Sequence, residues 1–260
     1  IIVLCGVHFM GETAKILCPD KKVLVPDLNA GCSLADSCPA TEFAEFVKQH
    51  PGHTVISYVN TTAAVKAVTD VVVTSTNARQ IVESFPEGTP MIFGPDRNLG
   101  NYINSITGRN MLLWDGACHV HEQFSLEKIL SLKKQYPNAE VITHPECKQP
   151  VIQVSDFVGS TAALLKYTIK SDAKQFIVAT ESGVIHEMRK RSPDKEFIPA
   201  PPNDSTCACN ECNFMRLNTM EKLYNCLKFE MPEIFVDEEV QKKAIKPIKK
   251  MLEISEKLGL

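Results

Sequence analysis

The sequence repeats one structural unit three times, and this repetition restricts the possible folds more than any other feature. Residues 2–16, 91–106 and 176–190 each read as a short apolar strand, a glycine-containing turn and a helix. Self-similarity at a period of about 85 residues indicates repeated structural units. Apolar strands rich in Val and Ile that alternate with helices predict parallel βα units, so the expected fold class is α/β.

A second short strand follows each helix and runs into a loop that contains a cysteine. Cys32, Cys118 and Cys212 therefore share one position of the repeat. Cys118 follows Cys32 by 86 residues and precedes Cys212 by 94, and the longer interval contains a Pro-rich loop. Ligands of parallel sheets bind beyond the carboxyl ends of the strands. If a pseudo-threefold axis relates the three units, these loops converge and bring three thiolates to one site.

Two of the three repeats also have an upstream half. The strand and following strand-to-helix turn at 54–60 and 71–78 resemble those at 140–146 and 156–163. The first repeat has no such half in this sequence, so we expect a further N-terminal half-repeat of roughly 50 residues or more. We predict a first α/β repeat at 1–52, a second at 53–138 and a third at 139–219, followed by C-terminal helices at 220–260 that pack on the first domain.

Three thiolates suit a 4Fe–4S cluster with one open iron, whereas the common electron-transfer cluster is held by four. An iron without a protein ligand can act as a Lewis acid on a substrate. Zinc is the main alternative, but structural zinc sites draw on two close pairs of ligands, and this sequence has one dense group, CACNEC at 207–212. Cys207 and Cys209, with Cys212, alternatively form a thiol redox switch.

Composition narrows the class of protein without identifying it. Ten cysteines are many for a reducing compartment, where clustered thiols serve metal or redox chemistry more often than disulfides. A net charge of −3 gives no indication of nucleic-acid or polybasic membrane binding. Apolar runs such as 1–5 and 176–179 are too short to span a bilayer, and no signal-peptide pattern is visible. We therefore predict a cytoplasmic globular protein.

Ten distinctive motifs follow one another along the chain. They include GVHFMGETAKIL at 6–17, AGCSLADSCP at 30–39, SYVNTTAAVKA at 57–67, WDGACHVHEQF at 114–124 and ATESGVIHEM at 179–188. Together these motifs resemble those of quinolinate synthases, and the resemblance covers essentially the whole chain. It implies three Rossmann-like parallel-sheet domains about a pseudo-threefold axis, with the active site at their junction.

The resemblance also implies a reaction and a cofactor. Quinolinate synthases condense iminosuccinate (iminoaspartate) with dihydroxyacetone phosphate to quinolinate in NAD biosynthesis, releasing phosphate and water. An L-aspartate oxidase or dehydrogenase that supplies the imine is the partner implied. The cysteines of the family's 4Fe–4S cluster fall on Cys32, Cys118 and Cys212, the same three that the repeat brings together.

Several predicted substrate-binding residues follow from the same resemblance. Tyr58 and Asn60 match a pair that holds the substrate carboxylates, although strand-end residues more often serve as capping groups. Ser75, and Ser160 with Thr161, are predicted to open helices. Hydroxyl and backbone N–H groups there bind phosphate or carboxylate, and plain helix capping is their ordinary role.

The predicted proton-transfer residues lie in the second and third repeats. His121, His144 and Glu146 match active-site positions of the family, and each can donate or accept a proton near neutral pH. Glu146 is a candidate base for enolisation and dehydration, and His144 a candidate anion-binding residue. We predict His121, Glu146 and Tyr58 as catalytic, with Glu181 as a secondary candidate.

Other functions remain open from the sequence alone. The family places a catalytic tyrosine, histidines and a phosphate-binding serine ahead of the position that Ile1 occupies, and we expect that segment to exist. An iron–sulfur hydro-lyase of the aconitase type is the alternative enzyme, although it needs a close CxxC pair that the repeat does not supply. A zinc- or cluster-bearing structural protein is the non-enzyme alternative, with the helices at 236–258 as its partner surface.

Overall fold

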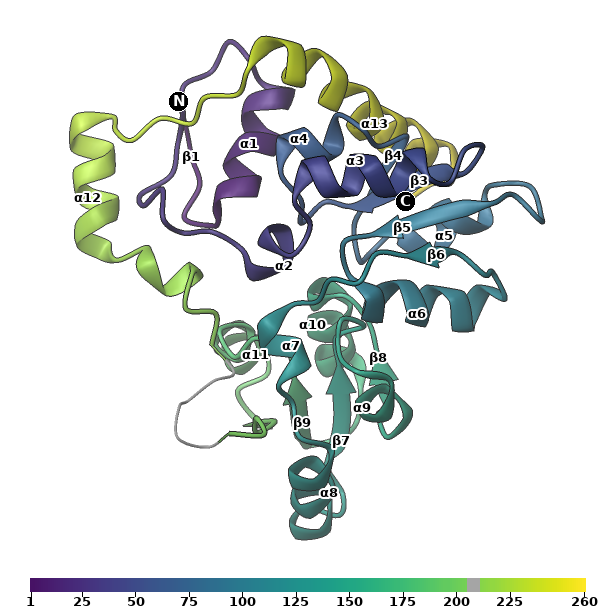
Figure 1. The fold of residues 1–260 in the computed structure, drawn as a ribbon. Coiled ribbons are helices and arrows are strands. Elements are labelled where there is room, and N and C mark those ends of the chain that lie inside the picture. Colours follow the sequence, from purple (N-terminus) through teal and green to yellow (C-terminus); the bar gives the residue numbers. More distant parts are fainter. Residues whose placement is uncertain (205–210) are drawn as a thin grey trace. The chain divides into compact units, whose positions relative to one another are not determined.

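The computed structural model describes residues 1–204 and 211–260, so Cys207 and Cys209 lie outside the described residues. Within these ranges the chain forms parallel sheets of two, four and four strands, flanked by helices (Figure 1). This confirms the predicted α/β class. The chain divides into two compact units, called unit 1 (Ile1–Gly116 with Asn213–Leu260) and unit 2 (Ala117–Cys212).

Unit 1 begins with the smallest sheet. Strand β1 (Ile2–Val3) pairs in parallel with β2 (Val23–Leu24), and α1 (His8–Leu17) connects them. Val23, Val25 and Ile234 form the buried cluster beside this pair. The glycine at position 11 lets α1 pack close to Val25 and Ile234, because an added Cβ would lie 2.8 Å from each of these side chains.

The second sheet of unit 1 has the strand order β4-β3-β5-β6. Its three longer strands, at 54–58, 71–73 and 91–94, are buried on both faces apart from Thr54, as expected for a parallel sheet covered by helices. The strands are β3 (Thr54–Tyr58), β4 (Val71–Val73), β5 (Met91–Gly94) and β6 (Leu112–Leu113). The helices around it are α2 (Ser33–Asp36), α3 (Ala40–Lys48), α4 (Ala63–Lys66), α5 (Ala78–Glu83) and α6 (Arg97–Thr107).

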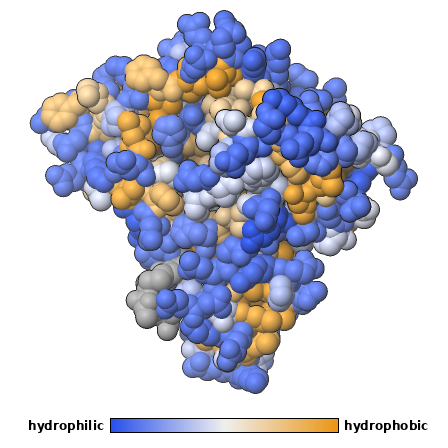
Figure 2. Space-filling view, in the orientation of Figure 1, coloured by the Kyte–Doolittle hydropathy of each residue, from blue (hydrophilic) through white to orange (hydrophobic). Residues whose placement is uncertain are grey.

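The C-terminal part of unit 1 is helical. After a 3₁₀ turn at Met215–Leu217 come α12 (Met220–Phe229) and α13 (Glu238–Lys257). Helix α13 packs mainly on β4 and α4 and also contacts α1. Figure 2 shows hydrophobic patches among hydrophilic surface. Helix α12 and the chain after it expose six large hydrophobic residues: Met220, Tyr224, Leu227, Phe229, Met231 and Phe235.

Unit 2 contains one sheet in the order β8-β7-β9-β10, the same order as the second sheet. Its strands are β7 (Glu140–Thr143), β8 (Phe157–Val158), β9 (Gln175–Ala179) and β10 (Glu196–Pro199). Its helices are α7 (His119–Glu122), α8 (Leu126–Gln135), α9 (Gln149–Gln153), α10 (Thr161–Lys170) and α11 (Val184–Arg191).

The internal repeat of these two sheets extends to individual hydrogen bonds. The Asp70 carboxylate accepts a hydrogen bond from the Val55 N–H at 2.8 Å, and Asp156 accepts one from the Val141 N–H at 2.8 Å. Asp156 lies 86 positions after Asp70, and Val141 lies 86 positions after Val55. Each bond ties the start of a central strand to the turn before the next strand.

Hydroxyl contacts repeat in the same way. The Ser57 and Thr69 hydroxyls lie 2.7 Å apart, and those of Thr143 and Ser155 lie 2.5 Å apart, again with a displacement of 86 residues. The second and third sheets are therefore copies of one supersecondary unit. The pseudo-threefold axis and the predicted domain boundaries stay predictions of the sequence.

None of the helices in the described parts of the chain is both long enough and apolar enough to cross a bilayer.

Candidate functional site

Unit 2 carries a buried cluster of titratable side chains beyond the carboxyl end of β7. His144 and Glu146 follow this strand and are 4 % and 3 % exposed. Cys118 is the residue before α7, and His121 lies on α7 one turn later. Residues three apart on a helix share a face, so this turn directs the Cys118 and His121 side chains to the same side. The fold thus gathers these four predicted residues.

The Glu146 carboxylate contacts both histidines. Its Oε2 lies 3.1 Å from His121 Nδ1 and its Oε1 lies 3.6 Å from His144 Nδ1. The two imidazole rings stack with centroids 4.8 Å apart. The Glu146 N–H donates to His144 Nδ1 at 3.4 Å, so the proton of a neutral His144 ring sits on Nε2.

Burial controls the charge of His144. The pKa of His144 is lowered from 6.5 to about 4, chiefly by burial; the Glu146 carboxylate raises it and the neighbouring His121 lowers it. His144 is therefore neutral at physiological pH, able to donate from Nε2. Burial also lowers the pKa of His119, the first residue of α7.

Cys118, His121 and Glu146 form a group that could hold a metal ion. Each offers one ligand atom, and these atoms lie within 4.8 Å of one another. His121 Nδ1 is buried, and within residues 1–204 and 211–260 it has no aligned hydrogen bond, despite the nearby Glu146 oxygen. A buried nitrogen in this state suits a ligand atom. A thiolate, an imidazole and a carboxylate are also ligands that zinc accepts.

The end of β9 adds residues on the same side of the sheet. Thr180 is 3 % exposed, and its hydroxyl lies 3.1 Å from His121 Nε2. The sequence analysis missed Thr180, although it lies in the motif that drew attention to Glu181. The Glu181 carboxylate accepts hydrogen bonds from the Gly183 N–H at 2.8 Å and the Cys212 N–H at 3.3 Å. Glu181 thereby ties the Cys212 backbone to the turn before α11.

Cys118 and Cys212 contact one apolar cluster. Both are half-buried and pack against the core that includes Val120, Ala179 and Ala200. Unlike the fully buried Cys147, they keep part of their surface accessible. Two of the three predicted cluster cysteines thus border the same region of unit 2.

The predicted anion-binding residues of unit 2 lie at the start of α10. Ser160 is its N-cap, and the Ser160 Oγ accepts the Ala163 N–H at 3.3 Å. This is the ordinary capping role that the sequence left open. Thr161 is the first residue of the helix and is exposed. The helix is long enough for its N-terminal N–H groups to attract an anion.

Unit 1 holds the remaining predicted residues. Cys32 is half-buried and precedes α2 in an extended backbone conformation, as Cys118 precedes α7. Tyr58 ends β3 and is 6 % exposed, and Asn60 follows in the next turn. Ser75 lies in a turn three residues before α5, not at the first residue of that helix as predicted. The meeting of Cys32 with Cys118 and Cys212 stays a prediction.

The sequence analysis also missed a buried lysine beside the Tyr58 turn. Lys66 ends α4 and is fully buried. Burial lowers its pKa to about 7, while the charges of Glu12 and Cys32 raise it. Lys66 therefore belongs to the surroundings of Cys32. Lys66 lies in the motif SYVNTTAAVKA, which could have drawn attention to it. Helical periodicity alone does not predict that its side chain is buried.

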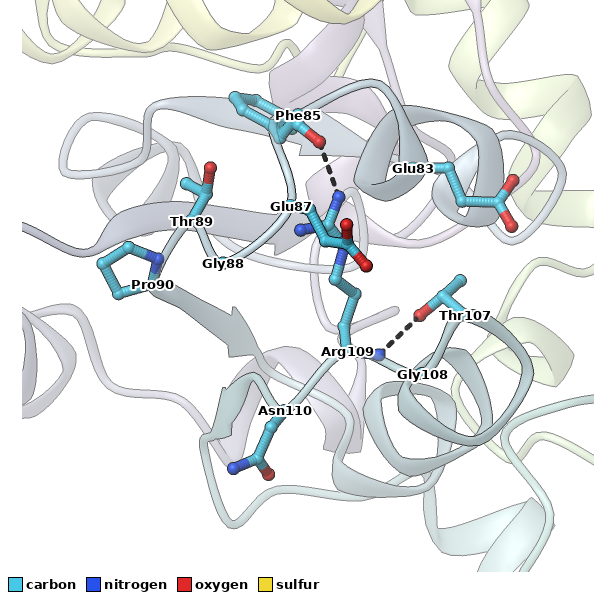
Figure 3. Close-up of a pocket in the computed structure, with 10 residues that line it drawn as sticks. All are labelled: Glu83, Phe85, Glu87, Gly88, Thr89, Pro90, Thr107, Gly108, Arg109 and Asn110. Carbon is cyan, nitrogen blue, oxygen red and sulfur yellow. Dashed lines mark hydrogen bonds between the residues drawn. The ribbon is translucent and has the colours of Figure 1, made fainter.

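Unit 1 also has a surface pocket that is separate from the predicted site residues (Figure 3). Thr89 and Pro90 line it just before β5 begins, and Thr107 and the glycine at 108 line it where α6 ends. The guanidinium of Arg109 donates to the Phe85 carbonyl at 2.5 Å. The pocket therefore lies at the amino ends of the strands, opposite to the end where Tyr58 lies, and it contains none of the predicted site residues.

Comparisons with known proteins point to one family. The sequence model of the family described as "Quinolinate synthetase A protein" matches residues 1–253. The quinolinate synthase of Thermosynechococcus vestitus is 58 % identical over 98 % of this chain and 80 % of its own length. Those of Chloroherpeton thalassium and a Synechocystis species are each 57 % identical over 98 % of this chain, covering 79 % and 80 % of the relatives. The chain belongs to the quinolinate synthetase A protein family.

Proposed function

We propose that this protein is a quinolinate synthase, which condenses iminosuccinate with dihydroxyacetone phosphate to quinolinate. Atom balance requires loss of phosphate and two molecules of water. The observation that carries the proposal is the Cys118–His121–Glu146 group, with its histidine and glutamate buried, at the strand ends of a chain that belongs to this family. Small-molecule substrates follow from this function, and we propose the cytoplasm as its compartment and an aspartate-oxidising enzyme as the source of the imine.

We further propose that Cys32, Cys118 and Cys212 hold a 4Fe–4S cluster. All three are half-buried, and Cys32 and Cys118 each precede a four-residue helix in an extended backbone conformation. Cys118 and Cys212 border one apolar cluster, which would shield part of a bound group from water. These features fit a cluster, which when bound would supply a Lewis-acidic iron with an open coordination position.

The proton transfers fall to the residues beyond β7 and β9. Ring formation needs a base that removes a proton from carbon and an acid that protonates leaving oxygen atoms. Glu146 is the proposed base, because its buried carboxylate lies within 3.6 Å of both histidines. His144 is neutral and can donate from Nε2 to a substrate oxygen. His121 lies between Glu146 on its Nδ1 side and the Thr180 hydroxyl on its Nε2 side, so it can carry a proton between them.

Neutral and helix-terminal groups are proposed to hold the substrate anions. Tyr58 and Asn60 offer donors to carboxylates, with Tyr58 also proposed as catalytic. Ser75, Ser160 and Thr161 lie in turns or at a helix start, where N–H and hydroxyl donors bind phosphate or carboxylate. Binding both substrates in fixed orientation raises their effective concentration at the reacting atoms.

Anaerobic purification followed by metal analysis tests the proposal. We expect iron and sulfide, broad absorbance near roughly 400 nm typical of iron–sulfur clusters, and quinolinate formation from in situ iminosuccinate and dihydroxyacetone phosphate. Cys118→Ala should lose the absorbance and the activity together. Cys18→Ser is the control, because Cys18 is equally half-buried but caps the end of α1. Zinc in place of iron, or quinolinate formation by Cys118→Ala, would contradict the cluster's role.

A further inference from the structure

Lys66 is a fully buried amine that the proposed mechanism does not yet use. It is the last residue of α4, and its side chain is enclosed within unit 1. Lysine is almost never fully buried without a specific partner. The inference drawn from it deepens the proposed function and rests on it.

The Lys66 amine binds the turn that carries Asn60. Its Nζ donates to the Val59 carbonyl at 2.9 Å and to the Thr61 carbonyl at 2.5 Å, the two carbonyls on either side of Asn60. Thr61 closes the turn further, since its Oγ1 donates to the Tyr58 carbonyl at 3.1 Å. The backbone from Tyr58 to Thr61 is thus fixed by donors on its inner side.

Helix α1, which belongs to the first repeat, packs beside the Lys66 amine. Lys66 Nζ lies 5.6 Å from the centroid of the Phe9 ring. The Glu12 carboxylate accepts the Ala63 N–H at 3.0 Å at the start of α4, and its charge acts on the Lys66 ammonium. The α4 helix and the turn before it are therefore held by side chains of two different repeats.

The third repeat shows that packing alone does not require a lysine at the position of Lys66. With the displacement of 86 residues, the position of Lys66 corresponds to Ile152 in α9. Ile152 is partly buried and packs against the apolar core of unit 2. An apolar residue fills the equivalent place in the same fold, so the amine of Lys66 serves something specific to the second repeat.

We propose that Lys66 is a positioning residue, whose amine holds the Val59 and Thr61 carbonyls and thereby fixes the turn that presents Tyr58 and Asn60 to a substrate dicarboxylate. An amine donates to two carbonyls whether or not it carries a charge. Holding the carbonyl oxygens inward also keeps their negative ends away from an approaching carboxylate. Without the amine, the carbonyl of the buried Thr61 would lose its donor and the Val59 carbonyl would keep only the Thr61 N–H at 2.8 Å, so the turn would rearrange to find donors.

Lys195 provides a matched control in unit 2. Its Nζ donates to the carbonyls of Thr168 and Ser171 at 2.7 and 2.5 Å and lies 5.6 Å from the Phe176 ring centroid. These are the same three kinds of contact that Lys66 makes. Lys195 precedes β10, so it lies at the amino end of its sheet, away from the predicted site.

The experiment compares Lys66→Met, Lys66→Arg and Lys195→Met in the iron-loaded protein. We expect Lys66→Met to raise the KM for iminosuccinate and the dissociation constant of quinolinate about tenfold, which is the size of one charge-assisted hydrogen bond. The iron content should not change. Lys66→Arg, which keeps the donors, should recover part of the affinity. Lys195→Met should lower the melting temperature without changing either constant.

Unchanged KM and quinolinate affinity in a folded Lys66→Met protein would overturn the inference. An equal loss of affinity in Lys195→Met would also overturn it, because the effect would then be general destabilisation. Circular dichroism and thermal melting identify a variant that fails to fold. If Lys66→Met fails to fold, Lys66→Ile replaces it, because isoleucine occupies the equivalent position in the third repeat. Lack of quinolinate formation by the iron-loaded wild type would contradict the proposed function itself, and with it this inference.

Discussion

The second and third sheets are built alike but end in different chemistry. They share a strand order, an aspartate that binds the central strand and a pair of contacting hydroxyls, all displaced by 86 residues. At the end of the central strand, however, Tyr58 and Asn60 in one repeat stand where His144 and Glu146 stand in the other. The first pair offers a phenol and an amide, which can donate hydrogen bonds to a bound anion, whereas the second pair offers an imidazole and a carboxylate, the groups of a general acid and base.

This difference indicates a division of labour between the repeats. Residues that hold the sheet together are fixed by the geometry of the βα unit, so they recur. Residues at and just beyond the carboxyl ends take no part in these repeated contacts, so they can differ between repeats that share the fold. The second repeat then contributes mainly binding groups, with Tyr58 as its catalytic candidate, and the third contributes acids and bases.

The largest effect should come from exchanging the acid–base residue of the third repeat. We expect Glu146→Gln to lower kcat by about 10²–10⁴-fold, the range for loss of a general base. The corresponding change in the second repeat, Asn60→Ala, should act mainly on KM, by about tenfold, because it removes a binding donor. Steady-state kinetics with both substrates separates the two.

The comparison would break if the two variants behaved alike. A loss of kcat in Asn60→Ala as large as that in Glu146→Gln would mean that both strand ends take part in proton transfer. The iron content of both proteins is the control, since Glu146 lies in the group that could hold a metal.

A smaller effect concerns the pH dependence of stability in the metal-free protein. The pKa of His144 is lowered by burial from 6.5 to about 4, so the folded state keeps this ring neutral. Its contribution to stability is complete above pH 6.5 and is lost as the pH falls from 6.5 towards 4, by up to about 3 kcal/mol. His144→Gln should flatten this part of the profile. Thermal melting between pH 7 and pH 4 measures it, and parallel profiles for wild type and variant would contradict the expectation.

The smallest effects should come from the shared scaffold. Asp70→Ala and Asp156→Ala each remove one carboxylate that accepts a strand N–H at 2.8 Å. Both aspartates are exposed, so water can partly replace the lost bond, and we expect each change to cost about 1 kcal/mol of unfolding free energy. Asp156→Ala should cost slightly more, because Lys133 also lies 3.4 Å from Asp156. Equilibrium urea unfolding checks both, and strongly unequal costs would show that the repeats differ in their scaffold too.

Much of this protein is determined by the sequence alone. The βα repeat, the α/β class and the family follow from local patterns, because strand periodicity, turn glycines and ordered motifs lie in contiguous segments. The position of Cys32 and Cys118 before short helices also follows, since equal spacing in copies of one unit gives equal placement. The helix start at Ser160 was predictable from capping chemistry, whereas the start of α5 was not: Asn77 takes the cap position there.

Only the tertiary structure decided which side chains meet. The contact of His121 with Thr180 joins residues 59 positions apart, and no local pattern encodes such a distance. Burial decided the rest: Lys66 reads as an ordinary helix lysine, and His144 as an ordinary titrating histidine, until the surrounding elements remove both from water. Desolvation arises from many distant segments packing together, so charge states are properties of the folded chain.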